Sequence, residues 1–385
     1  MALSSQTTGI DARRAPGRAR ARASTGTVWP ARAAVPVGIV CVAVGVGLLP
    51  FLVEQTGSAE AVLAGILVVA GAALTVTGTV LATRGARLPW RLAVGSVTLV
   101  VTLLVTSVVG QAVAATNVPR TSLGRTPADL GLVHTSVTLR TTDGVALAGW
   151  YLPSTNRAAV VLLHGAGSTR SSVLPQARVL SRAGFGVLLV DARGHGASGG
   201  RAMDFGWLGD PDIDAATRFL SGRPDVDPDR IGAVGMSMGG EEAIGATGTN
   251  TVLKAVVAEG ATRRTADDEA WLSDRYGARG SVQEVLEHLQ DWVTDRLTSA
   301  QIPTPLREAV ARSHATYLLV TAGERADEGH AASHIATAAP DRVETWAVPG
   351  AGHTQGLETE PEEWARRVAG FLAQELGVEA RGAWS

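Results

Sequence analysis

IGAVGMSMGGEEAIGA, residues 231–246, contains a short apolar run, a serine between two glycines and a helix-compatible run. Residues 231–234 have the composition of a central strand that is buried on both faces. Residues 235–239 match the pattern G-x-S-x-G, in which a serine occupies a sharp turn between a strand and a helix and exposes its hydroxyl. Gly235 and Gly239 allow the backbone to make that turn without a clash. The stretch therefore predicts an α/β fold and Ser237 as a nucleophile.

A second segment, Gly196-Ala197-Ser198-Gly199-Gly200, fits the same expression. In a chain with 45 glycines the expression is a weak signal without its structural context. Ser198 lies seven residues beyond the nearest apolar run, among too many glycines to begin a helix. We expect Ser198 to belong to a structural turn.

Short apolar runs continue on both sides of Ser237. An alternating pair, residues 135–140 and 145–151, surrounds the turn dipeptide Asp143-Gly144 and predicts an antiparallel hairpin. Helix-like segments, for example 173–183 and 212–220, separate the later runs. This alternation predicts a mostly parallel sheet flanked by helices. The apolar runs are residues 159–163, 186–190, 231–234, 255–258, 317–321 and 343–348.

A nucleophilic serine needs a histidine base, and the base needs a carboxylate that orients it. His353 follows the last apolar run in a Gly/Pro-rich loop and is the preferred base. The acid is expected after the run 317–321, where Asp327 is preferred over Glu324 and Glu328. Glu324 is close to the strand end, and Glu328 could already belong to the next helix. The order Ser, acid, His agrees with the order in α/β-hydrolases.

Donors for a developing oxyanion are expected in the loop His164-Gly165-Ala166-Gly167, directly after the run 159–163. The amide N–H groups of Ala166 and Met238, the residue after the nucleophile, are the predicted pair. His164 itself is expected to make structural hydrogen bonds.

Residues 135–376 resemble the α/β-hydrolase superfamily on four signs: His164-Gly165, the run from Asp191 to Ser198, the turn at Ser237 and Gly350-Ala351-Gly352-His353. The chain is most similar to the branch that includes dienelactone hydrolases, acyl-peptidases and membrane-tethered bacterial hydrolases. The resemblance implies a structural role for Asp191, Arg193 and His195. The family commonly has Gly-x-x-Asp after the strand, but Ala326 stands at that position here, with Asp327 one residue later.

This resemblance implies a serine hydrolase that cleaves an ester, thioester or amide through Ser237, His353 and Asp327. An acyltransferase that uses the same residues is one alternative, and a non-catalytic membrane-tethered binding module is another. Neither a cofactor nor a metal is expected, because the sequence has no H-E-x-x-H motif and no cysteine cluster. The expected partner is a small acyl substrate.

Three charge-free stretches, residues 33–53, 61–82 and 92–119, are long enough to cross a bilayer as helices. A buried hydrophobic subdomain is the alternative to three membrane spans. Residues 1–116 carry nine Arg against Asp11, Glu54 and Glu60, so their net charge is +6; the other 25 basic and 33 acidic residues give −8. Arginines cluster before the first stretch and between the second and third. By the positive-inside rule, the N-terminus is cytoplasmic and the later domain lies outside a cell membrane.

The expected organisation has four parts: a disordered basic tail (1–32), a three-span region (33–116), a linker (117–134) and a hydrolase domain (135–385). Residues 259–315 are expected to form a short cap, because this connection is too long for a plain crossover. Trp271, Tyr276 and Trp292 could line a pocket or pack the cap onto the core. Arg263-Arg264 could bind an anion or end a solvated helix. A net charge of −2 makes a nucleic-acid partner unlikely, and the oligomeric state stays open.

Overall fold

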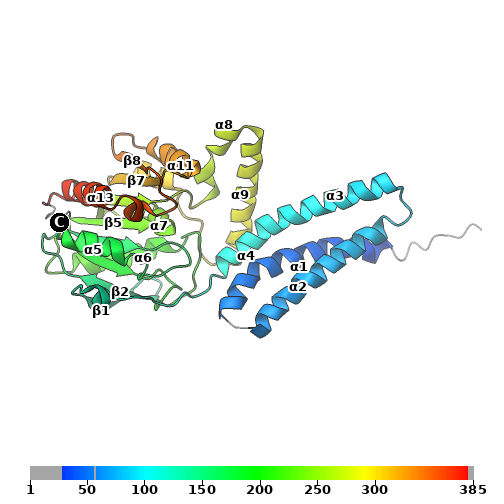
Figure 1. Ribbon diagram of the computed structural model, residues 1–385, viewed down its shortest axis with the longest axis horizontal. Coiled ribbons are helices and arrows are strands. Elements are labelled where there is room, and N and C mark those ends of the chain that lie inside the picture. Colours follow the sequence, from blue (N-terminus) through cyan, green and yellow to red (C-terminus); the bar gives the residue numbers. More distant parts are fainter. Residues whose placement is uncertain (1–27, 56–57, 380–385) are drawn as a thin grey trace, which may run out of the picture.

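The computed structural model describes residues 28–55 and 58–379 and contains two parts, an α/β domain and a set of long helices beside it (Figure 1). Most of the basic tail lies outside the described residues. The first helix begins at Val28, earlier than the expected boundary at residue 33.

The α/β domain is built on one eight-stranded sheet with the order β1-β2-β4-β3-β5-β6-β7-β8. β1 and β2 form the predicted antiparallel hairpin, β2 pairs antiparallel with β4, and all remaining pairs are parallel. Every predicted strand is present, which confirms the fold class. The strands are β1 (Thr135–Arg140), β2 (Ala146–Leu152), β3 (Ala159–Leu163), β4 (Gly186–Val190), β5 (Ile231–Met236), β6 (Leu253–Glu259), β7 (Thr316–Ala322) and β8 (Val343–Val348).

Helices cover both faces of this sheet. One core contains apolar residues of α5 (Leu174–Arg182) and α13 (Pro361–Glu375). The other core, on the opposite face, contains apolar residues from four helices: α6 (Gly209–Ser221), α7 (Met238–Ala246), α10 (Leu306–Arg312) and α11 (Ala326–Ala336). Because β3, β4 and β5 are buried on both faces, their sequences are apolar throughout rather than alternating.

Three N-terminal segments, residues 33–54, 60–82 and 88–116, are helical and apolar enough to cross a membrane. They belong to α1 (Val28–Gln55), α2 (Ser58–Ala82) and α3 (Leu88–Val105). A π-helical turn, Thr106–Gly110, joins α3 to the short α4 (Gln111–Thr116). The third segment begins at Leu88 rather than at residue 92, so Arg91 lies in its first turn.

Glycines allow α1 and α2 to pack closely. A Cβ atom on Gly38 would lie 2.6 Å from the carbonyl oxygen of Gly71, and one on Gly71 would lie 2.8 Å from that of Gly38. A Cβ on Gly45 would lie 2.7 Å from a methyl group of Val68. Such small-residue contacts are how helices associate in lipid, where no hydrophobic driving force pulls them together.

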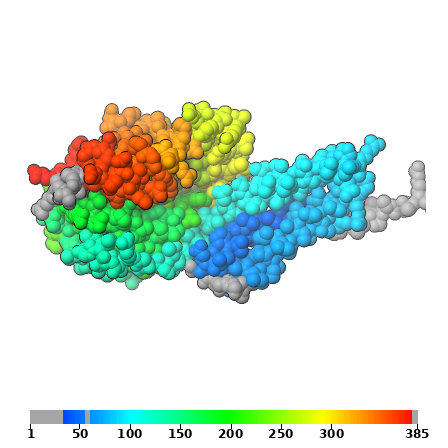
Figure 2. Space-filling model, viewed as in Figure 1, coloured from blue at the N-terminus to red at the C-terminus, as the bar shows by residue number. Residues whose placement is uncertain are grey.

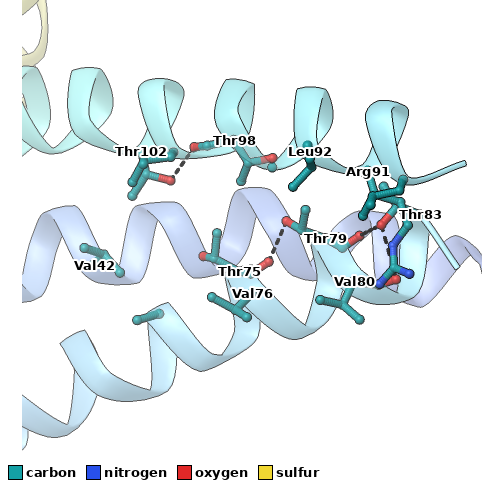
Figure 3. Close-up of a pocket in the computed structure, with 14 residues that line it drawn as sticks. Val42, Thr75, Val76, Thr79, Val80, Thr83, Arg91, Leu92, Thr98 and Thr102 are labelled. Atoms are coloured by element: carbon teal, nitrogen blue, oxygen red, sulfur yellow. Dashed lines mark hydrogen bonds between the residues drawn. The ribbon is translucent and has the colours of Figure 1, made fainter. Parts of the chain in front are cut away.

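A pocket of about 530 Å³ lies between α2 and α3, and five threonines line it (Figure 3). Their hydroxyls donate to carbonyl oxygens four residues earlier, for example Thr79 to Thr75 at 2.7 Å and Thr102 to Thr98 at 2.7 Å. These bonds satisfy the hydroxyls within each helix, as a nonpolar environment requires. The five are Thr75, Thr79, Thr83, Thr98 and Thr102.

The linker and the segment expected to form a cap both lie between the N-terminal helices and the α/β domain. Arg120 donates to the carbonyl oxygens of Gly196 and Ser198, and the 3₁₀ turn Pro127–Leu130 leads into β1. The segment expected to form a cap is mostly helical, with α8 (Leu272–Tyr276), the long α9 (Ala278–Leu297) and α10. α9 stands at the edge of the α/β domain beside α4 (Figure 1).

Candidate active site

The sheet brings the expected loops to one edge. Leu163 of β3 pairs with Gly235 of β5, and Met236 of β5 pairs with Glu259 of β6. Because β3, β5 and β6 are parallel and in this register, the loops that follow them leave the same edge side by side. Open α/β sheets bind ligands at this carboxyl edge.

Ser237 stands on the predicted sharp turn between β5 and α7. Its backbone has φ 52° and ψ −122°, a strained conformation for a residue with a side chain. Its amide donates to the carbonyl oxygen of Glu259 at 2.7 Å, which fixes the turn against β6. A Cβ on Gly235 would lie 2.2 Å from the carbonyl oxygen of Gly239, and one on Gly239 would lie 2.6 Å from that of His164. The turn therefore requires both glycines of the motif.

The structure brings Ser237 and His353 together. His353 Nε2 lies 2.9 Å from Ser237 Oγ, and its Nδ1 lies 2.7 Å from Oε1 of Glu328. Hydrogen bonds thus connect a hydroxyl, an imidazole and a carboxylate in one line, the arrangement that activates a serine.

Glu328, rather than the preferred Asp327, is the acid that contacts the imidazole in this structure. Asp327 is exposed and accepts a hydrogen bond from the Tyr276 hydroxyl at 2.6 Å. Glu324 is also exposed. The three acids stand where β7 passes into α11, and neighbouring residues of a helix point about 100° apart. Only one of them can therefore face the loop that carries His353. Because α11 begins at Ala326, the residue that faces this loop is Glu328.

Hydrogen bonds to both of its oxygens hold the Glu328 side chain in place. Its side chain is 5% exposed, and Oε2 accepts the amide of Ala322 at 2.8 Å while Oε1 faces the ring. The hydrogen bond to Glu328 raises the pKa of His353 above its ordinary value, since the carboxylate stabilises the imidazolium. Gly260 packs behind the ring, where a Cβ would lie 2.8 Å from His353 Cε1.

The predicted oxyanion loop lies against the serine. A Cβ on Gly165 would lie 3.4 Å from both the Met236 carbonyl oxygen and Ser237 Cβ. Within the described part of the chain, the amides of Ala166 and Met238 have no acceptor. The linker from the helical part also reaches this loop, because the Thr121 hydroxyl donates to the Gly167 carbonyl oxygen at 2.7 Å.

Glu259, which the sequence did not single out, ties the site together. Its buried carboxylate accepts the Gly356 amide at 2.7 Å and the Trp364 indole N–H at 2.8 Å, and its carbonyl oxygen accepts the Ser237 amide. One residue therefore supports both the serine turn and the loop after His353. The available signal was an acid directly after the apolar run 255–258.

The segment from Asp191 to Ser198 is structural, as the resemblance implied. Asp191 is fully buried and forms an ion pair with Arg170 at 2.8 Å. The Ser198 hydroxyl donates to the Asp191 carbonyl oxygen at 2.6 Å and accepts the Ala148 amide at 2.9 Å. His164 accepts the Ala192 amide at Nε2, and burial lowers its pKa to about 3, so the ring is neutral. Ser198 is not placed to attack a substrate.

The cap residues divide between two places. Trp271 makes tilted ring contacts with Tyr276 and His330, whereas Trp292 on α9 is 55% exposed. Arg264 is completely buried and pairs with Asp210 at 2.7 Å, and Arg263 pairs with Glu287. The two arginines are therefore internal ion-pair partners; neither ends a solvated helix. Residues 28–55 and 58–379 contain no group of three or more potential metal ligands.

Comparison with known proteins extends this picture. The family model described as serine aminopeptidase, S33, matches residues 154–350, which include Ser237 and Glu328 and end just before His353. An esterase of Pyrococcus furiosus has a similar structure, with a TM-score of 0.55 and 26% identity over 68% of this chain and 99% of the esterase.

Curated relatives match over shorter regions. An uncharacterized Mycobacterium tuberculosis protein is 40% identical over 28% of this chain and 39% of its own length. A thiohydrolase of Aspergillus aculeatus is 37% identical over 29% of this chain and 37% of its own length. The chain thus spans about two fifths of the length of these relatives. The match to the family model covers just over half of the chain, residues 154–350 of 385, and agrees with the fold and the serine turn. The chain belongs to the serine aminopeptidase S33 family of α/β-hydrolases.

Proposed function

We propose that this protein is a membrane-anchored serine hydrolase that cleaves an ester or thioester through Ser237, His353 and Glu328. The observation that carries the proposal is the continuous pair of hydrogen bonds from Ser237 Oγ to His353 and from His353 to Glu328. The similarity to an esterase and to a thiohydrolase supports acyl chemistry at a carbonyl carbon.

In the proposed reaction, His353 Nε2 takes the Ser237 proton while Oγ forms a bond to the substrate carbonyl carbon. The amides of Ala166 and Met238 donate to the resulting oxyanion, and Met238 adds the positive end of the α7 dipole. The intermediate then expels the alcohol or thiol, which receives the proton from Nε2. Water, deprotonated by His353, releases the acid and restores Ser237.

Exposure of the site favours hydrolysis over acyl transfer. The His353 side chain is 39% exposed, so water can reach the acyl-enzyme without a conformational change. An acyltransferase needs a site that excludes water from this intermediate. A binding module without catalysis has no use for a strained serine whose hydroxyl meets a carboxylate-oriented imidazole.

We also propose that α1, α2 and α3 cross the cell membrane and hold the hydrolase domain on the outer side. Arg84 and Arg87 lie between the second and third apolar segments, and Arg91 lies in the first turn of the third, so the positive-inside rule places this end of the helices in the cytoplasm. An odd number of spans then puts the domain opposite the N-terminus.

The direct test is hydrolysis of p-nitrophenyl butyrate by the full chain in detergent, compared with the Ser237→Ala and Ser198→Ala variants. Ser237→Ala should lower kcat by about 10⁴-fold or more without loss of folding. Ser198→Ala should keep the wild-type kcat while lowering stability by about 1–3 kcal/mol, because two buried hydrogen bonds are lost.

Full activity in the Ser237→Ala variant would rule out the proposal. An amino acid p-nitroanilide, tested in parallel, distinguishes the alternative bond type. Turnover of the anilide with no turnover of the ester would identify an aminopeptidase and contradict the ester assignment.

A further inference from the structure

Helix α9 buries polar residues against the protein and exposes apolar ones, whereas a surface helix of a soluble protein usually does the opposite. Its buried residues are Gly280, Gln290, Asp291 and Thr294. Its exposed residues include an apolar stripe, here called the α9 stripe, at the helical spacing of three and four. The stripe is Val282 (59% exposed), Val285 (59%), Leu289 (47%) and Trp292 (55%).

Specific bonds hold the polar face of α9 against the α/β domain. Arg263 pairs with Glu287 and, at 3.2 Å, with Asp291. Asp291 also accepts the Ala266 amide at 2.7 Å. Rotating the helix to bury its stripe would break these bonds and leave charges without partners. The outward orientation of the stripe is therefore built into the fold.

The position of α9 shows which environment the stripe meets. The helix contacts α4 and the π-helical turn, where the third apolar segment ends. In Figure 1 it stands at the edge of the α/β domain, crosswise to α1, α2 and α3, and Figure 2 shows the same segment beside α3. The stripe lies on the face of α9 that is turned away from the α/β domain. Helix α9 thus adjoins helices whose own apolar side chains are exposed.

Aromatic and basic residues stand near both ends of α9. The Arg296 guanidinium lies 3.7 Å from the ring centre of Trp292, and that of Arg279 lies 5.8 Å from the ring centre of Tyr276. Leu297 and Ile302, which are also exposed, extend the apolar surface beyond the helix. Trp, Tyr and Arg side chains of this kind, beside the ends of membrane-spanning helices, are typical of the headgroup region of a bilayer.

We infer that α9 is an interfacial helix whose stripe lies in the outer leaflet of the membrane that α1, α2 and α3 cross. The inference rests on the proposed membrane anchor. A helix with a polar face held by protein and an apolar face turned outward, directly beside the spans, matches an interfacial helix. It would hold the hydrolase domain at the lipid surface, where acyl substrates of low solubility collect.

The test measures the depth of single fluorophores in the full chain, reconstituted in phosphatidylcholine–phosphatidylglycerol vesicles. Cys41→Ala removes the single native thiol. An NBD label is then placed at Leu289→Cys in α9, at Val69→Cys in the middle of α2, or at Val133→Cys in the linker. Val69 and Val133 are 70% and 79% exposed, so they report the span and the aqueous surface. Quenchers are lipids with a spin label at carbon 5 or carbon 12 and aqueous iodide.

We expect the Val69 label to be quenched most by the deep spin label, the Leu289 label most by the shallow one, and the Val133 label by iodide alone. A Leu289 label that behaves like the Val133 label would overturn the inference while leaving the anchor intact. Shielding of Leu289 from iodide without quenching by lipid would also overturn it, since a second copy or another protein would then cover the stripe. Iodide quenching at Val69 would contradict the anchor itself.

Discussion

The chemistry of the site depends on which carboxylate meets His353. Glu328 reaches Nδ1 of the ring at 2.7 Å and is itself fixed by the Ala322 amide, whereas Asp327 binds the hydroxyl of Tyr276 in the cap. A buried carboxylate held by a backbone amide keeps the imidazole in the tautomer that leaves Nε2 free to accept the serine proton.

Glu328→Gln should therefore lower kcat by about 10³–10⁴-fold, because a glutamine presents an N–H group to Nδ1 and favours the wrong tautomer. Glu328 raises the pKa of His353, and the reaction needs the neutral ring. Removing the negative charge lowers that pKa, so the acid limb of the kcat/KM profile should move to lower pH. Asp327→Asn is the matched control and should change neither quantity. If kcat and the acid limb of the pH–rate profile changed in Asp327→Asn but not in Glu328→Gln, Asp327 would be the acid.

The sequence predicted the serine and the histidine of the site, because the positions of both follow from the order of strands and helices along the chain. Ser237 had a strand before it and a helix after it, and His353 followed the last strand in a loop. The identity of the acid was harder to predict because it depends on the residue at which α11 begins, and helix ends are poorly specified by local sequence. Glu259 and Gly260 were missed because their roles come from contacts between loops that are distant in the chain.

At the scale of elements, the pairing of α1 with α2 is set by glycines rather than by large apolar residues. The structure places Gly71 directly against α1, since its Cβ would lie 2.9 Å from Cβ of Cys41. Gly65 lies on a different face of α2, where an added Cβ would meet no described atom within 4 Å beyond its own helix and chain neighbours. The sequence predicted three apolar helices of the right length but carried no information about which of their faces meet.

A cysteine at position 71 should form a disulfide with Cys41 under mild oxidation, because moving α2 away from α1 by about one ångström relieves the contact of the new Cβ with the Gly38 carbonyl oxygen and brings the two Cβ atoms to the separation of a disulfide. Gly71→Cys is therefore expected to lose both free thiols after treatment with copper phenanthroline, as measured by maleimide addition and intact mass. Gly65→Cys, with the same composition, should keep both. Equal oxidation of the two variants would contradict the packing of α1 on α2.

For the molecule as a whole, charge and hydropathy differ between two parts of the chain, and the average composition conceals this difference. Residues 1–116, which include the apolar helices, carry a net charge of +6 from 9 Arg against 3 acids, and residues 117–385 carry −8 from 25 basic against 33 acidic residues. All eight strands were predicted, the central ones because strands buried on both faces are apolar throughout, and β1 and β2 because they alternate around Asp143-Gly144. The outward orientation of the α9 stripe was not predicted, because helical spacing alone cannot distinguish a core-facing side from a lipid-facing one.

The proposed topology predicts which positions are accessible from outside an intact cell. In a Cys41→Ala background, Val133→Cys should react with a membrane-impermeant maleimide without lysis. Ala86→Cys, in the turn between α2 and α3, should react only after the membrane is permeabilised. Labelling of Ala86 but not Val133 in intact cells would place the hydrolase domain in the cytoplasm.

The proposed reaction depends first on Ser237, activated by His353, as the nucleophile. The most direct measurement is the site of covalent attachment of a fluorophosphonate to the full chain in detergent, located by peptide mass spectrometry. We expect one adduct on Ser237, no adduct in Ser237→Ala, and labelling slowed by at least about 10³-fold in His353→Ala. An adduct on another residue, or rapid labelling of the Ser237→Ala variant, would contradict it.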